Sequence, residues 1–249
     1  MEDMIELFKD ESIVHSPVKV VMVNTFGKEE WGVDNGGVLR DALSAFWCSF
    51  YDSCTVGEDE RVPAIRHDFK EAEWEATARI LVKGYKEVKF FPVKLSKAFI
   101  FATLFEEKQL PDQRLLDSFL AYASKDERDL INAALSGDEL NEEQNEQWNN
   151  FLDRFSSKRV PAKKERATVI VELAHKEIVQ VAQYIIDSWK KPLKKNVLSC
   201  VGFTSIESLK QLYAKTKPTV KSLKPDISGT NQQFPARRAF VFEALYQRT

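Results

Sequence analysis

The stretch from Val18 to Trp47 constrains the fold of this chain more than any other part of it. It begins with the apolar run Val20–Val23 and ends in a segment whose apolar residues recur every three or four positions. Four of the nine glycines of the chain lie between residues 27 and 37. Because glycine tolerates positive φ and close backbone approach, this order of residues predicts a buried strand, a tight turn and an amphipathic helix.

The overall composition argues against several classes of protein. With 43% hydrophobic residues in 249 positions, the chain is long enough to bury a sizeable core. Its 36 basic and 38 acidic side chains nearly cancel, which argues against a main role in holding nucleic acid or an acidic membrane. No apolar run approaches the roughly 20 residues of a membrane-spanning helix. Three cysteines without metal-ligand spacing, and an N-terminus without signal-peptide layout, favour an intracellular protein of the cytoplasm or nucleus.

Hydrophobic periodicity predicts a mainly α chain with a few short strands, an α+β arrangement. We expect strands at 18–26, 62–65, 88–91 and 197–203. We expect helices at 38–54, 71–84, 94–105, 111–120, 127–135, 138–155, 166–189, 204–213 and 235–249. Gly84 is expected to end its helix as a C-cap, and residues 156–164 form a polar, basic joint.

Motifs that carry chemistry are missing from the sequence. His15, His67 and His175 are far apart and in no ligand spacing, and we expect His175 to be a half-buried structural residue. The patterns of serine hydrolases, zinc proteases, dinucleotide-binding folds and P-loops do not occur. The apolar neighbours of Cys200 favour a structural thiol. We therefore expect no metal, no cofactor and no catalytic residue in this chain.

The segment GVDNGGVLRDALSAFW resembles the start of HECT-type ubiquitin ligase domains. In that family an apolar strand runs into a Gly-x-Asp-x-Gly-Gly turn and then into a helix that carries an Arg. The matching residues are Gly32, Asp34, Gly36, Gly37 and Arg40. Later segments are also similar to the family: 166–193 to its long helix, 203–215 to a short helix, and 232–249 to the helix that ends its N-terminal lobe.

The resemblance implies the N-terminal lobe of a HECT-like domain, a bilobed helical domain with a few short strands. It implies a larger subdomain, 1–105 plus 161–249, and a small helical subdomain, 106–160, that docks a ubiquitin-conjugating enzyme. In the family, a cysteine of a C-terminal lobe takes ubiquitin as a thioester and passes it to a substrate lysine. We expect that lobe to be absent from this chain, so the chain alone is not expected to be an active ubiquitin-protein transferase.

The expected partners are therefore a ubiquitin-conjugating enzyme and ubiquitin. The alternative is a catalytically inactive interaction module that keeps the fold. The small subdomain departs from the family, since an acidic helical patch at 138–150 stands where the family has a hairpin.

A docking surface should be an exposed apolar groove, and its candidates lie in the small subdomain. For each of the five candidate docking residues the alternative is ordinary core packing. Asp34 and Arg40 are expected to be structural, paired with buried backbone. The docking candidates are Leu116, Phe119, Tyr122, Trp148 and Phe151.

Overall fold

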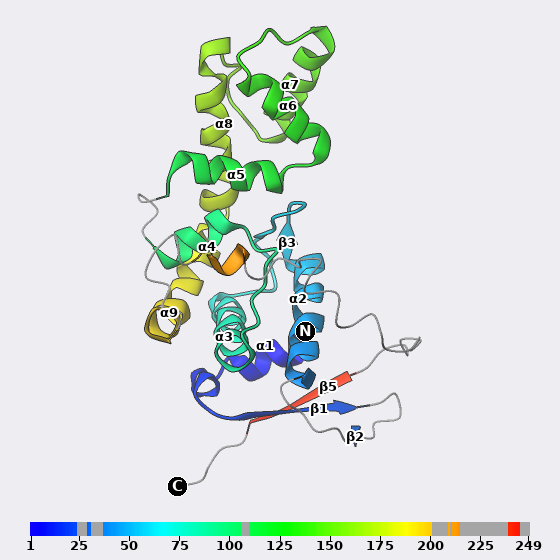
Figure 1. The fold of residues 1–249 in the computed structure, drawn as a ribbon, viewed down its shortest axis with the longest axis vertical. Helices are drawn as coiled ribbons and strands as arrows, with labels where there is room; N and C mark the ends of the chain where they lie inside the picture. Colours follow the sequence, from blue (N-terminus) through cyan, green and yellow to red (C-terminus); the bar gives the residue numbers. More distant parts are fainter. Residues whose placement is uncertain are drawn as a thin grey trace. The chain divides into compact units, whose positions relative to one another are not determined.

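A computed structural model describes residues 1–23, 29–30, 37–105, 110–200, 209, 211–214 and 239–244. The chain divides into two compact units, and Figure 1 shows their helices and strands. The first unit comprises Met1–Phe50, Ala72–Val93 and Lys191–Thr249, and the second comprises Tyr51–Glu71 and Lys94–Lys190. Helices predominate in the described residues, which confirms the mainly helical class. Each helix in the described ranges is too short or too polar to span a membrane.

The first unit contains a three-stranded antiparallel sheet in the order β2-β1-β5. Strand β1 (Val18–Val23) confirms the predicted strand over residues 18–23, and residues 24–26 of that prediction lie outside the described residues. It pairs with β2 (Glu29–Glu30) and, over its whole length, with β5 (Ala239–Ala244). The helix predicted at 235–249 is therefore wrong over residues 239–244. The segment AFVFEA is rich in aromatic and β-branched residues, and pairing with β1 satisfies its backbone as a strand.

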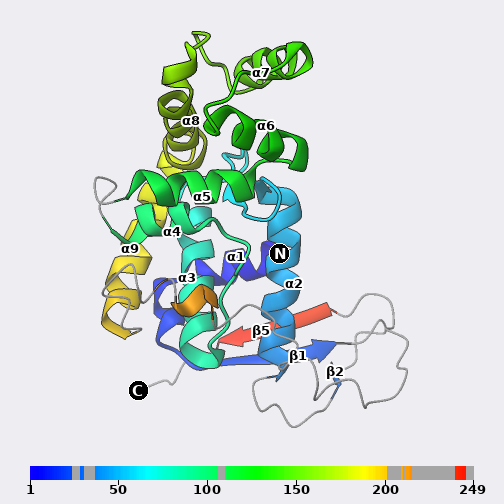
Figure 2. The same cartoon turned by 45° about the horizontal axis from the view of Figure 1, so that its top comes forward.

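Helices of the first unit lie on one side of this sheet (Figures 1 and 2). They include α1 (Glu2–Phe8), η1 (Glu11–Val14), α2 (Gly37–Cys54, to Phe50 in this unit) and α3 (Glu71–Val88). Aromatic rings join α2 to α3, since Phe50 meets Trp74 edge to face at 6.3 Å between ring centroids. Arg79 of α3 donates to the carbonyl of Phe8, which holds the end of α1 against α3.

Gly84 has a different role from the one expected. Helix α3 continues past it to Val88, and Gly84 is buried within the helix. A Cβ atom there would lie 2.9 Å from Cδ1 of Leu43 on α2. The glycine therefore allows α3 to approach α2 closely and does not cap a helix end.

The second unit is a helical cluster with one short hairpin, β3 (Thr55–Val56) and β4 (Val62–Pro63). Its helices are α4 (Lys97–Leu104), α5 (Asp112–Tyr122), α6 (Lys125–Leu135), α7 (Glu142–Arg154), η3 (Lys163–Glu165), α8 (Arg166–His175) and η4 (Lys176–Gln180), with Gln183–Lys190 of α9. Ser124 and Asn141 begin α6 and α7 with reciprocal capping boxes. Helix α8 packs against α5 and α6.

The helix predicted at 166–189 is interrupted and longer than expected. Helix α8 passes into one π turn, η4, and α9 (Gln183–Cys200) then continues to Cys200 with Pro192 inside it. The extended segment predicted at 197–203 is therefore wrong for residues 197–200. Residues 209 and 211–214 are helical as predicted, whereas the predicted capping box at 204–207 lies outside the described residues.

The boundaries of the two compact units differ from those of the predicted subdomains. Helix α4 and the run from α8 into α9 group with α5–α7. In the prediction they belonged to the larger subdomain, 1–105 plus 161–249. Packing of α8 against α5 and α6 accounts for the difference.

Candidate functional site

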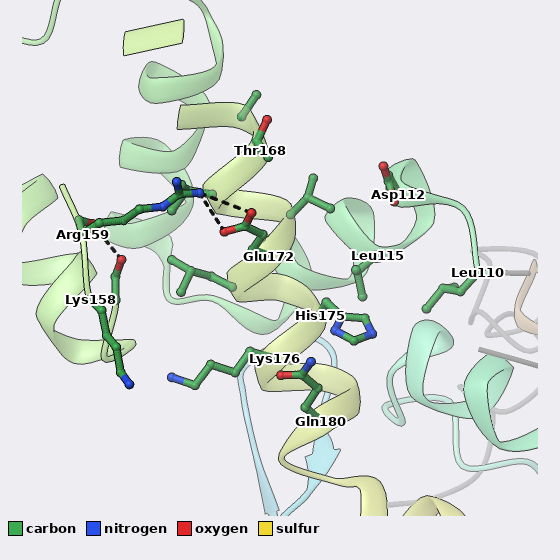
Figure 3. Close-up of a pocket in the computed structure, with 15 residues that line it drawn as sticks. Leu110, Asp112, Leu115, Lys158, Arg159, Thr168, Glu172, His175, Lys176 and Gln180 are labelled. Atoms are coloured by element: carbon green, nitrogen blue, oxygen red, sulfur yellow. Dashed lines mark hydrogen bonds and ion pairs between the residues drawn. The ribbon is translucent and has the colours of Figure 1, made fainter. Parts of the chain in front are cut away.

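A groove of about 860 Å³ lies beside α8 in the second unit (Figure 3). We call it the α8 groove. Fifteen residues line it: Leu110, Asp112, Leu115, Ser157, Lys158, Arg159, Ala167, Thr168, Val169, Val171, Glu172, Leu173, His175, Lys176 and Gln180. Its volume falls within the range of about 300 to 1,000 Å³ that is usual for ligand sites.

Local folding of the chain brings three segments together around the groove. Pro111 precedes the first residue of α5 and so turns the chain into that helix. At the end of α7, Ser156 adopts a positive φ of 51°, and the amide of Ser157 donates to the carbonyl of Leu152 at 2.8 Å. This reversal directs residues 157–159 away from α7, and they form a wall of the α8 groove.

Cations gather on the wall formed by residues 157–159. Arg159 donates to Glu172 of α8, with 3.2 Å between the guanidinium nitrogen and the carboxylate oxygen. Both side chains are more than half exposed, so this pair contributes little to stability. Lys158 is exposed and forms no ion pair within the described part of the chain. Nζ of Lys176 donates to the carbonyl of Phe155 at 2.5 Å, which fixes this ammonium group beside the same wall.

The π turn η4 follows α8 directly, and its wider hydrogen bond runs from the amide of Val181 to the carbonyl of Lys176 at 2.9 Å. Such turns occur often at functional sites. Burial raises the pKa of Glu177 within this turn, and the charges of Lys176 and Arg154 oppose that rise. Burial, with a smaller contribution from Glu177, raises the pKa of Tyr122 to about 12. Neither Glu177 nor Tyr122 lines the α8 groove, so both shifts follow from packing.

Most of the predicted docking residues belong to the core of the second unit. The exposed fractions are 0% for Phe119, 2% for Trp148, 3% for Phe151 and 8% for Tyr122. The ring of Phe151 stacks on Trp148 at 5.4 Å and meets Phe119 at 6.5 Å between centroids. The expectation that these four side chains form an exposed groove is therefore wrong. They pack as core residues, and only Leu116 is partly exposed.

The glycine-rich motif is described only in part. Gly37 is the first residue of α2, and a Cβ atom there would meet nothing within 4 Å. Arg40 is exposed in the first turn of α2, and its expected pairing with buried backbone is not seen among the described residues. Gly32, Asp34 and Gly36 lie outside the described residues, so their expected structural role stays a prediction.

Histidines and cysteines form no catalytic cluster in the described ranges. His15 and His67 are exposed, and His175 is half-buried as predicted. Cys54 is buried, with its sulfur 3.7 Å from a guanidinium nitrogen of Arg66. The same ranges contain no group of three acidic, His or Cys side chains placed to hold a metal ion.

Sequence reasoning missed the α8 groove, although one signal for it was present. Residues 157–164 contain four basic side chains and no acidic one, and they follow a helix with an aromatic stripe. The pattern indicates an exposed basic joint. Only the folded chain places that joint opposite the start of α5.

The comparisons with known proteins leave the family open. No family model, no curated protein and no solved structure matches this chain.

Proposed function

We propose that this chain is the N-terminal lobe of a HECT-like ubiquitin-protein ligase. The observation that carries the proposal is the order of elements around the glycine-rich motif. Strand β1, at Val18–Val23, precedes the Gly-x-Asp-x-Gly-Gly segment, and α2 begins at Gly37 and carries Arg40. This is the order that the family resemblance requires.

In this role the lobe would position reactants and would not form or break bonds. It would hold a ubiquitin-conjugating enzyme so that ubiquitin passes, as a thioester, to a cysteine of a C-terminal lobe. Holding donor and acceptor in a fixed geometry supplies much of the rate of such a transfer. The cysteines of this chain, Cys48, Cys54 and Cys200, do not lie in a Thr-Cys-Phe-type motif, so we expect none of them to receive ubiquitin.

A second candidate function is an interaction module that keeps the fold without taking part in transfer. The observation that favours it is the α8 groove, together with apolar side chains that remain exposed near it. Val160 is 71% exposed next to Arg159, and Val181 is 47% exposed next to Gln180. Exposed apolar groups beside a groove are typical of interaction surfaces.

Titration of the chain against a panel of labelled ubiquitin-conjugating enzymes tests the first proposal. We expect at least one enzyme to bind, and we expect Leu116→Ala to weaken that binding because Leu116 is the one predicted docking residue with an accessible side chain. Val56→Ala is the matched control, since Val56 is 45% exposed and was not a docking candidate. If every enzyme fails to bind at high micromolar concentration, the interaction module becomes the better account.

Assays of thioester formation separate positioning from catalysis. The chain is mixed with charged conjugating enzyme, and the products are resolved with and without reducing agent. We expect no ubiquitin adduct on the chain. A reducible adduct that disappears in Cys200→Ala or Cys54→Ala would contradict the assignment of a purely positioning role.

A further inference from the structure

We propose that the α8 groove binds an acidic linear peptide that carries apolar anchor residues. This inference goes beyond the proposed docking of a conjugating enzyme and does not depend on it. It rests on three properties: the apolar floor of the groove, the exposed apolar side chains close in sequence to its lining residues, and the basic segment that forms one wall.

The apolar floor comes from α8 and the start of α5. Leu115, Val169 and Leu173 line the groove, although at most 5% of each is exposed, so their side chains already pack against the unit. Leu110 and Val171 line it as well and remain partly exposed. An apolar anchor that covers these two side chains would remove apolar surface from water, at about 25 cal/mol for each Å² buried.

Exposed apolar residues extend this surface beyond the lining of the groove. The second unit has five large apolar side chains that are more than a third exposed, among the residues described. Two of them adjoin lining residues in sequence, since Val160 follows Arg159 and Val181 follows Gln180, and Tyr184 lies four positions beyond Gln180. An extended peptide could contact both of these segments, whereas a compact small molecule would not span them.

The charge of one wall favours an acidic partner. Lys158 and Arg159 lie in this wall, and Lys163 and Lys164 follow it in the chain, with no acidic residue between Ser157 and Lys164. Lys158 and Lys164 form no ion pair in the described part of the chain. The other two cations have only exposed partners, Glu172 for Arg159 and Glu139 for Lys163. A partner carboxylate could therefore pair with Lys158 directly and could replace Glu172 at the fork-shaped guanidinium of Arg159.

Nucleic acid fits the same surface less well. Asp112 and Glu172 also line the groove. They would repel a phosphate backbone, which carries a charge at every nucleotide, whereas a peptide can place its acidic residues away from them. Phe, Tyr and Trp side chains, which stack on the bases of single strands, are absent from the lining residues. A peptide can place carboxylates at the basic wall and apolar anchors along the floor, so it satisfies both halves of the surface.

Fluorescence anisotropy with synthetic probes tests this proposal on the full chain. The probe is a fluorescein-labelled peptide in which Asp and Glu alternate with Leu and Phe. Its counterpart carries Lys in place of every acidic residue, and a labelled oligothymidine is the nucleic-acid probe. We expect binding of the acidic probe that weakens with added salt, and no binding of the lysine counterpart.

Two variants of the groove, and one control, locate the binding site. The double variant Lys158→Glu with Arg159→Glu reverses the charge of the wall and should weaken the acidic probe about tenfold or more, equivalent to about 1.4 kcal/mol. Ala167→Glu places a carboxylate at an exposed lining position in the first turn of α8, where the helix dipole accepts it, and should weaken the probe as well. Lys125→Glu, at an exposed position of α6 outside the groove, should leave the affinity unchanged.

Four outcomes would overturn the proposal. They are no binding of the acidic peptide, tighter binding of oligothymidine than of the acidic peptide, equal affinity for the lysine counterpart, and equal loss in Lys125→Glu and in the groove variants. Circular dichroism of each variant verifies that the helices remain folded. The probes contain no conjugating enzyme. Failure of peptide binding would therefore contradict the peptide site without bearing on the docking of a conjugating enzyme, which the titration tests separately.

Discussion

Replacement of Phe119 by Ala distinguishes a core residue from a docking residue. Its ring is fully buried, and its centroid lies 5.4 Å from that of Phe155 and 6.0 Å from that of Tyr122. Burial of this kind makes a Phe-to-Ala change cost about 3 to 5 kcal/mol, because the removed ring leaves a cavity. Typical domains have only about 5 to 15 kcal/mol of stability in total, so this one change would remove a large share.

Urea denaturation followed by tryptophan fluorescence measures this cost. Trp148 stacks on Phe151 in the same cluster, so its emission reports on this core. With a denaturant slope of about 2 to 3 kcal/mol per molar urea, the midpoint should fall by roughly 1 to 2.5 M. Leu116→Ala, at a partly exposed position of the same helix, should shift the midpoint much less.

The reasoning would be refuted by a small shift in Phe119→Ala. Surface substitutions usually change stability by no more than about 0.5 kcal/mol, which corresponds to about 0.25 M here. A midpoint within that range, together with weaker binding of a conjugating enzyme, would mean that Phe119 is an exposed anchor and that the core of this unit is packed differently.

Three further predictions concern the second unit, and each is checked by chemical or thermal denaturation. Gly57 and Gly137 both have a positive φ, of 108° and 79°. A Cβ atom at Gly57 would lie 2.4 Å from a backbone oxygen, whereas a Cβ atom at Gly137 would meet nothing within 4 Å. Gly57→Ala should therefore cost clearly more than the roughly 1 to 2 kcal/mol expected for Gly137→Ala, and equal costs would contradict the described turn. Glu60 is buried and accepts hydrogen bonds from both the amide and Nζ of Lys97, at 2.9 and 2.6 Å. Glu60→Ala should thus destabilise the unit by about 1 to 3 kcal/mol because these donors lose their partner, and a neutral result would argue against this contact. Burial raises the pKa of Glu177, so its carboxyl group holds a proton more tightly in the folded state than in the unfolded state. Stability therefore falls as the pH rises from the pKa of the unfolded state through the raised pKa of the folded state. Glu177→Gln should raise the free energy of unfolding at pH 7 by less than about 1 kcal/mol after solvent screening, and the melting temperature with it. This gain in stability should disappear below pH 4. A gain that persists there would contradict the link between the raised pKa and stability.

Local patterns in the sequence were sufficient to predict many of the elements. Strand β1 and helices α2, α5, α6 and α7 were predicted because each has a clear apolar period or a recognisable first residue. Pro111 precedes its helix in the structure. Ends were less certain, because a helix can continue through a residue such as Gly84 when packing favours it.

Long-range packing decided what the sequence could not predict. Strand β5 pairs with β1, more than two hundred positions earlier in the chain, and the aromatic and apolar pattern of β5 also fits a helix. The stripe with Trp148 and Phe151 has the periodicity of any amphipathic helix, so it could not reveal whether its partner is the core or another protein. Contact with Phe119 places it in the core. The α8 groove likewise requires a turn at Ser156 that no local motif predicts.

The central claim is that this chain holds a ubiquitin-conjugating enzyme, and amide hydrogen exchange tests it most directly. Exchange is measured by mass spectrometry for the chain alone and with each enzyme of the panel. With at least one enzyme, we expect slower exchange in α5–α7 and unchanged exchange in the strands β1 and β5. Unchanged exchange throughout the chain with every enzyme, at concentrations up to high micromolar, would contradict the claim.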